Sequence, residues 1–320
     1  PFSFKFCQTV EGTIQNQESN VYQKPRFNSV AVILSGCGVF DGSEVTETIS
    51  ILIQLQKMNV KVHMFAPNQD QHHVINHTNG EVMNEKRNVL EQSKLFGSEV
   101  RDIKTLNAEE FQALLIPGGF GVAKNLSNFA EKGEEFTVNE DVSKAIQDFN
   151  NQAKPIGAVC ISPILIAKVL GEKKPMITLG KRQTEKDNKW PHSGAIDVAE
   201  KLGATTIERS PSAFQIDFSN KIITSPCFMY DGFKKFSTAN EGIQLVCQIM
   251  EQMHYGKKIV LNDIFQKQNE ARLERQGQQA QQQGFQGQYQ QGYQGQQQGN
   301  ESNRNYRNQR KQKNEYQEED

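Results

Sequence analysis

The chain has 320 residues, of which 36 are Lys or Arg and 37 are Asp or Glu, so its formal net charge is −1. This balance lacks the basic excess of a typical nucleic-acid-binding domain, and we expect no nucleic-acid partner. The five cysteines form no CxxC pair, which argues against a disulfide framework or a zinc ribbon and favours a reducing compartment. No apolar run is long enough to cross a membrane, so we expect no transmembrane segment.

Residues 1–27 show no sustained hydrophobic period and are rich in Gln, Asn and Ser. We therefore expect an N-terminal extension that lies on a surface. The first residue is Pro1 and not Met, which leaves both a natural processed end and a cut chain open.

From Ser29 onward, short apolar strands alternate with amphipathic helices over roughly 230 residues, and the domain is expected to span 28–258. The predicted strands are 29–35, 60–66, 113–119, 154–160, 213–218 and 221–226, and the predicted helices are 42–58, 161–170, 142–152, 196–203 and 233–254. In the first helix, the side chains expected to face inward are Val45, Ile49, Leu52, Ile53 and Leu55 or Gln56. The alternation predicts an α/β fold with a doubly wound, mostly parallel sheet that is covered on both faces.

The stretch PIGAVCISPILIAKVL (155–170) places Cys160 at the joint between a buried strand and a helix. Pro163 is tolerated there because the first turn of a helix does not need its N–H group. A thiolate at a helix N-terminus is stabilised by the helix dipole, so we expect a lowered pKa and a reactive cysteine. An inert buried cysteine is the alternative interpretation.

Two further loops follow strands and are expected at the same edge of the sheet as AVCISP (158–163): SGCGVFDGSE (35–44) and IPGGFGVAKNLSNFA (116–130). Glu44 opens the first helix, and it is either a proton carrier beside Cys160 or a plain helix N-terminal charge. The Gly118–Gly119 turn permits backbone N–H groups to approach a ligand closely.

Four residues of these and neighbouring loops are candidates for the pocket: Cys37, Gly118, Asn125 and His77. Cys37 is either a resolving thiol for Cys160 or a small loop residue. The spacing of His72, His73 and His77 matches neither a helix face nor a zinc-protease motif, so we expect no metal site.

The composition changes beyond residue 258. Residues 276–299 hold 14 Gln and 6 Gly and no charge, and such a segment buries too little apolar surface to offset its ordering entropy. We therefore predict a low-complexity tail at 259–320. That tail carries eight basic and eight acidic residues, which weakens an RNA-binding interpretation.

Several motifs occur in one order: LSGCGVFDGSEVTE, VINHTNGE, EKRNVLEQS, LLIPGGFGVAKNLSNFA, VCISP, KIITSP and the more eukaryotic KWPHSGA. They resemble the ElbB-type proteins and their mitochondrial eukaryotic relatives, over about residues 28–256. This family belongs to the PfpI and class I glutamine-amidotransferase-like superfamily. The resemblance implies a flavodoxin-like sheet and a mitochondrial location, with the targeting segment absent from this chain.

The resemblance also implies the site. Cys160 corresponds to the nucleophile, Glu44 to the acidic partner, and the backbone N–H groups of Gly119 and Ile161 to the oxyanion donors. Ile161 stands where the protease-like members carry His, and no glutaminase Glu/His pair follows downstream. A hydrolase triad and glutaminase chemistry are therefore not expected.

What the resemblance implies is a glyoxalase-like enzyme for small reactive carbonyls, with a Cys nucleophile, a Glu acid/base and no cofactor. The alternative is an accessory subunit of a large mitochondrial assembly, such as a respiratory one, whose site is vestigial and whose protein partners bind residues 1–27 and 259–320. A redox sensor that uses an exposed, low-pKa Cys160 is a third interpretation.

Overall fold

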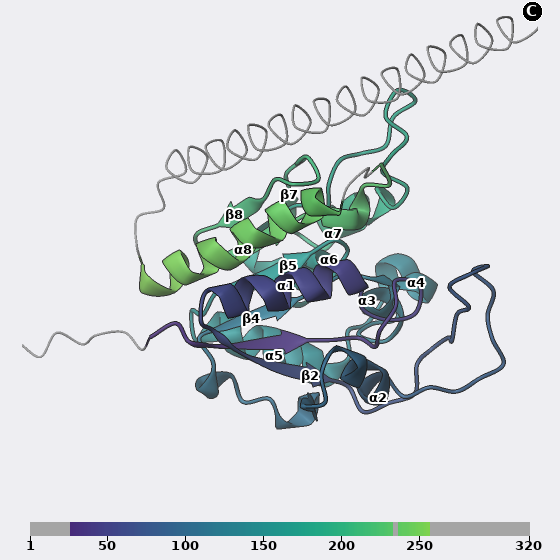
Figure 1. The fold of residues 1–320 in the computed structure, drawn as a ribbon. Helices are drawn as coiled ribbons and strands as arrows, with labels where there is room; N and C mark the ends of the chain where they lie inside the picture. Colours follow the sequence, from purple (N-terminus) through teal and green to yellow (C-terminus); the bar gives the residue numbers. More distant parts are fainter. Residues whose placement is uncertain (1–25, 233–235, 257–320) are drawn as a thin grey trace, which may run out of the picture. The chain divides into compact units, whose positions relative to one another are not determined.

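The computed structural model describes residues 26–232 and 236–256 (Figure 1). The predicted low-complexity tail at 259–320 and nearly all of the N-terminal extension at 1–27 lie outside the described residues. The partner contacts expected for both segments therefore remain predictions.

Within the described residues, the main element is a seven-stranded sheet. Its strands are β1 (Ser29–Ile33), β2 (Lys61–Ala66), β3 (Val100–Asp102), β4 (Ala113–Ile116), β5 (Ile156–Val159), β8 (Gln215–Asp217) and β9 (Ile222–Ser225). Their order is β3-β2-β1-β4-β5-β9-β8, and every pairing is parallel except the antiparallel pair β8–β9. The predicted α/β class with a flavodoxin-like, mostly parallel sheet is confirmed.

The central strands are apolar runs because both faces of the sheet are covered. All residues of β4 and β5 are buried, and β1 pairs with β2 on one side and β4 on the other, with Val30 opposite Val62 and Ala113. The crossovers bring the carboxyl ends of β1, β4 and β5 to one edge, which is where loops of such sheets bind ligands.

Eight α-helices accompany this sheet in the described residues. They are α1 (Val45–Lys57), α2 (Val89–Ser93), α3 (Phe120–Lys124), α4 (Phe129–Lys132), α5 (Glu140–Asn151), α6 (Pro163–Leu170), α7 (Gly194–Lys201) and α8 (Ser237–Tyr255). Helices α1 and α8 lie side by side (Figure 1), and α8 also packs on β5 and β9, whereas α5 packs against β4, β5 and α6. None of these helices is both long and apolar enough to span a membrane.

The inward face of α1 differs from the predicted one. Val45, Ile49 and Ile53 are 43%, 40% and 43% exposed, whereas Leu55 is buried as expected. The buried face contains polar side chains, because α1 packs beside the candidate site and against α8. Its buried residues are Glu47, Thr48, Ser50, Ile51, Gln54 and Leu55. The helical spacing of the apolar residues therefore predicted the wrong buried face for this helix.

A second, two-stranded parallel sheet is formed by β6 (Met176–Ile177) and β7 (Thr205–Thr206). It lies between the end of α6 and the antiparallel strand β8 in the chain. The loop at 178–193 connects β6 to α7 and includes Trp190, which is 2% exposed. This loop supplies one wall of the candidate site.

Candidate active site

Cys160 lies between β5 and α6 in a strained backbone conformation. Its φ is +60°, in the left-handed region that non-glycine residues adopt rarely and at a cost of roughly 1–3 kcal/mol. Its N–H donates to the Ser225 carbonyl at 2.9 Å, which anchors the turn to β9. The Ser162 hydroxyl donates to the Pro117 carbonyl at 2.5 Å and ties the same turn to the loop after β4. These bonds hold the sulfur at the carboxyl edge of the sheet.

The carboxyl group that contacts this thiol belongs to Glu47. Glu47 is fully buried, its Oε2 accepts the Gly118 N–H at 2.8 Å and its Oε1 accepts the Phe228 N–H at 3.2 Å. The Cys160 thiol adds a hydrogen bond to the same carboxyl. Burial first, and the nearby Glu44 second, raise the pKa of Glu47 from its ordinary 4.5 to about 8. Glu47 is therefore mostly protonated at neutral pH, and its ionised fraction can accept a proton from Cys160.

Burial controls the thiol as well. Cys160 is 7% exposed, and its pKa lies well above the ordinary value because of desolvation first, then Glu47 and Cys227. The N–H groups of Gly119 and Ile161 donate to the sulfur and oppose this shift without overcoming it. The expected lowering of the Cys160 pKa is thus wrong, because loss of hydration outweighs the helix N-terminus. The resting residue is a protonated thiol.

Glu44 occupies a neighbouring position with a different contact. It is the N-cap of α1, and its Oε2 accepts the Glu47 N–H at 2.6 Å. Glu44 and Cys160 line the same cavity, but the contact with the thiol expected for Glu44 is made by Glu47, one helical turn further along. The reason is that the side chain of Glu47, in the first turn, projects toward the helix N-terminus and the edge of the sheet. The carboxylate of Glu44, at the N-cap, instead accepts a hydrogen bond from the helix backbone. Sequence reasoning missed Glu47, although its spacing of three from Glu44 was a usable signal.

The two glycines of the loop after β4 permit this close packing. A Cβ on Gly118 would lie 2.3 Å from the Cys160 Cβ and 2.6 Å from the Glu47 Oε2. Gly119 has φ +102°, and a Cβ there would lie 2.3 Å from the Gly42 carbonyl oxygen. Only glycine fits at these positions while the thiol, the carboxyl and the first loop stay in contact.

A cavity of about 420 Å³ opens beside the cysteine. Among the predicted site residues, Cys160, Glu44, Gly119 and Ile161 line it. The other lining residues are Val39, Phe120, Ala123, Phe129, Ala130, Pro191, His192, Gly194, Ala195, Phe228 and Met229. The structure thus brings the three predicted loops together and adds a fourth wall from the segment that contains KWPHSGA.

His192 is a lining residue that sequence reasoning missed. Its ring packs edge-on against Phe120, with ring centroids 5.2 Å apart and an interplanar angle of 89°. Burial lowers its pKa, although Asp231 opposes this shift, so the imidazole is neutral at neutral pH. The only available signal was the position of His192 in KWPHSGA, which carried no chemical spacing to Cys160.

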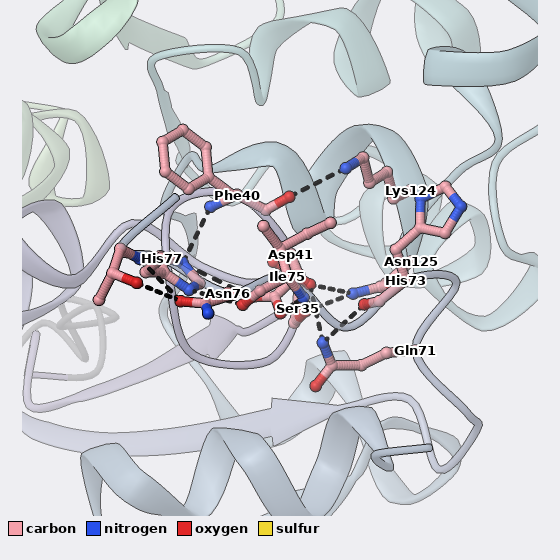
Figure 2. Close-up of polar contacts among 11 residues, drawn as sticks. Ser35, Phe40, Asp41, Gln71, His73, Ile75, Asn76, His77, Lys124 and Asn125 are labelled. Carbon is pink, nitrogen blue, oxygen red and sulfur yellow. Dashed lines mark hydrogen bonds and ion pairs between the residues drawn. The ribbon is translucent and has the colours of Figure 1, made fainter. Parts of the chain in front are cut away.

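Asn125 does not line this cavity but holds its first loop in place (Figure 2). Its amide nitrogen donates to the carbonyls of Ser35 at 2.9 Å and Asp41 at 2.8 Å, and its oxygen accepts the His72 N–H at 3.0 Å. The side chain is 3% exposed. Asn125 therefore connects α3 to the loops after β1 and β2.

His77 likewise supports the first loop and is not among the lining residues (Figure 2). Its Nε2 accepts the Phe40 N–H at 3.2 Å, and its Nδ1 lies 3.1 Å from the Ile75 carbonyl, which assigns the proton to Nδ1. The buried Asp41 accepts the Ile75 N–H at 2.8 Å. These bonds join the loop after β1 to the hairpin-like segment that follows β2.

Cys37 and the histidine cluster show no catalytic arrangement. Cys37 is half-buried at the base of the first loop and is not a lining residue; burial first and Asp41 second raise its pKa. His72 lies 3.3 Å from Glu131 and its ring contacts His73. No group of three or more His, Cys, Asp or Glu side chains suited to a metal ion occurs in the part of the chain that the structure describes.

With this geometry established, known proteins provide a comparison. No protein-family model matches the chain. It is 42% identical over 202 residues to the ES1 protein homolog, mitochondrial, of Rattus norvegicus, covering 62% of this chain and 75% of that protein. It is 41% identical to the glutamine amidotransferase-like class 1 domain-containing protein 3, mitochondrial, of Homo sapiens, covering 62% and 74%. A crystal structure of an isoprenoid biosynthesis protein with amidotransferase-like domain from Ehrlichia chaffeensis is 32% identical, with a TM-score of 0.63, covering 71% of this chain and 99% of that one.

Proposed function

The chain belongs to the family of the mitochondrial ES1 and glutamine amidotransferase-like class 1 proteins, and from this premise we propose that it is a cofactor-free, glyoxalase-like enzyme. The superfamily and the mitochondrial location implied by the resemblance are confirmed by these relatives. The observation that carries the proposed chemistry is the contact between the Cys160 thiol and the buried Glu47 carboxyl.

In the first step, the Cys160 sulfur adds to the aldehyde carbon of an α-oxoaldehyde. The step starts from the ionised form of Glu47, which is the minor form below its pKa of about 8. The new carbon–sulfur bond forms as the carbonyl π bond breaks, and Glu47 takes the thiol proton and passes it to the resulting oxygen, so that it is ionised again. The N–H groups of Gly119 and Ile161, which point at the sulfur, are the proposed donors to that oxygen. The product is a hemithioacetal.

In the second step, the ionised Glu47 removes the proton from the former aldehyde carbon, and the electron pair of that bond moves toward the ketone oxygen, which gives an enediolate. Glu47 returns this proton to the neighbouring carbon, while the hydroxyl proton of the first carbon passes to the former ketone oxygen. The ketone thus becomes an alcohol and the first carbon becomes a thioester. Water then cleaves the thioester, releasing a 2-hydroxy acid and restoring the thiol. The net reaction is the addition of one water, and no external oxidant or reductant is needed.

The proposal is tested with methylglyoxal and purified protein, without added thiol or metal, by chromatographic measurement of lactate. Cys160→Ser is expected to abolish turnover because it removes the nucleophile. Glu47→Gln is expected to lower kcat/KM by roughly 10²–10⁴-fold, the usual contribution of a general acid–base group.

Glu44→Gln is the matched comparison, because glutamine keeps an oxygen that can cap α1. We expect a smaller loss than for Glu47→Gln. A larger loss of kcat/KM for Glu44→Gln than for Glu47→Gln would indicate that Glu44 is the proton carrier. Unchanged turnover in Cys160→Ser would refute the mechanism.

The accessory-subunit alternative remains a prediction. The segments expected to bind an assembly are 1–27 and 259–320, which lie outside the described residues except for Arg26 and Phe27. No contact of the described domain favours it over the enzyme.

A further inference from the structure

The walls of the cavity indicate which carbonyl compounds the site takes. We propose, resting on the proposed function, that the substrates are uncharged α-oxoaldehydes whose second carbon bears a large apolar substituent, and that three-carbon oxoaldehydes are poor substrates.

The first argument is size and polarity. A volume of about 420 Å³ falls within the range of sites that enclose ligands much larger than methylglyoxal. Most of the wall is apolar, with Phe120, Phe129, Phe228 and Met229 as its large members. With its aldehyde at Cys160, a three-carbon compound leaves most of this surface uncovered, whereas a larger apolar substituent removes it from water.

The second argument is charge. Among the described residues that line the cavity there is no Lys or Arg, and Glu44 is the lining carboxylic acid. The nearby Lys124 is not a lining residue, and its ammonium group already has other contacts. It donates to the Phe40 carbonyl at 3.0 Å and lies 5.5 Å from the Phe120 ring centroid. A carboxylate or phosphate on the substrate would lose hydration without gaining a cationic partner, and Glu44 would repel it.

The third argument is the aromatic character of one wall of the cavity. His192 is neutral at neutral pH and packs edge-on against Phe120, so the two rings form one continuous aromatic surface. Such a surface favours flat or aliphatic groups over ionic ones.

Gly194 offers a position at which the size of the cavity can be changed. It is the first residue of α7 and lines the cavity, and a Cβ placed on it has no atom within 4 Å. Gly194→Phe therefore adds a ring into open space without a backbone clash. Thr205→Phe adds the same ring at an exposed position of β7 that does not line the cavity, and serves as the matched control.

The experiment measures kcat/KM of the full chain for two pairs of substrates. Methylglyoxal and 2-oxooctanal differ in apolar size, and phenylglyoxal and 4-carboxyphenylglyoxal differ in charge. We expect 2-oxooctanal and phenylglyoxal to be preferred within their pairs by at least about tenfold, since a single methylene in an apolar pocket already changes selectivity by about 10–200-fold. Gly194→Phe is expected to lower the 2-oxooctanal to methylglyoxal ratio by at least about tenfold, and Thr205→Phe to keep the parent ratio.

A preference for methylglyoxal, or a ratio unaffected by Gly194→Phe in protein with the parent Tm, would overturn the inference while the proposed function stands. If no oxoaldehyde is converted, the proposed function fails, and binding decides the inference separately. Calorimetric titration of Cys160→Ser with acetophenone should then show binding. The added substitution Gly194→Phe should abolish this binding, and 4-acetylbenzoate should bind more weakly than acetophenone. Equal binding of the two ketones, or binding of neither, would overturn it.

Discussion

At the scale of single residues, the site depends on a carboxyl group whose ionisation is opposed by its surroundings. The folded protein keeps the Glu47 proton up to about pH 8, whereas the unfolded chain releases it near the ordinary 4.5. Between these values the folded state binds more protons than the unfolded state, so the stability contributed by this group falls as pH rises. The effect is on the order of 1.4 kcal/mol for each unit between the two pKa values.

Glu47→Gln removes this titration while keeping the shape of the side chain. We expect the free energy of unfolding of the variant to increase relative to the parent protein as pH rises from 5 to 8, by a few kcal/mol in total. Urea unfolding at pH 5, 6.5 and 8 measures it. Cys160→Ser, which leaves the carboxyl buried, should retain the parent's pH dependence, and a pH-independent difference between Glu47→Gln and the parent would contradict the assignment.

The residues of the site were predictable only in part. Cys160 could be placed because a strand of apolar residues meets a helix with proline in its first turn. For Glu47 the sequence held only its spacing from Glu44, since its contact with the thiol depends on how α1 is rotated. His192 could not be predicted, because it lies on a loop far along the chain. The raised pKa of the Cys160 thiol could not be predicted from the sequence either, because the burial of the thiol depends on how the segments around it pack in the folded protein.

At the scale of secondary-structure elements, α1 shows why periodicity alone misleads. Apolar side chains at Val45, Ile49 and Ile53 repeat with helical spacing and yet are exposed. The opposite side of the helix carries the carboxyl that the site needs, so polar residues occupy the buried face. The strands were easier to predict, because runs buried on both faces of a parallel sheet need no alternation.

The orientation of α1 is tested by two substitutions two residues apart. Ile51 is fully buried and Ile49 is 40% exposed. We expect Ile51→Ala to lower the free energy of unfolding by about 2–5 kcal/mol, and Ile49→Gln to change it by no more than about 0.5 kcal/mol. Denaturant unfolding compares the two, and equal costs would show that α1 is rotated from its described position.

At the scale of the whole molecule, the described residues form a sheet with its helical covering, which is the unit that the strand–helix alternation predicted. The sequence also predicted the parallel core, but not the small sheet of β6 and β7, whose two-residue strands carry no periodic signal. The predicted boundaries at 28 and 258 remain a proposal.

That proposal has a direct test. The uncharged Gln- and Gly-rich stretch at 276–299 has little apolar surface to bury. We therefore expect deletion of residues 276–320 to leave the Tm of the isolated protein nearly unchanged, and to weaken its retention in any assembly that binds the tail. Calorimetry measures the first and co-purification the second. A substantially lower Tm would place the tail within the folded core.

The burial of Cys160 has a consequence for the working lifetime of the protein. Peroxides consume cysteines chiefly as thiolates, and progressive oxidation is irreversible beyond the sulfenic acid in most proteins. A thiol that is 7% exposed and held protonated is a slow target for such reagents, which disfavours the sensor interpretation. Under the proposed function, the sulfur attacks only when a carbonyl carbon lies beside it and the ionised form of Glu47 takes the thiol proton. The same desolvation that slows attack by the free thiol would then protect it from oxidation between turnovers.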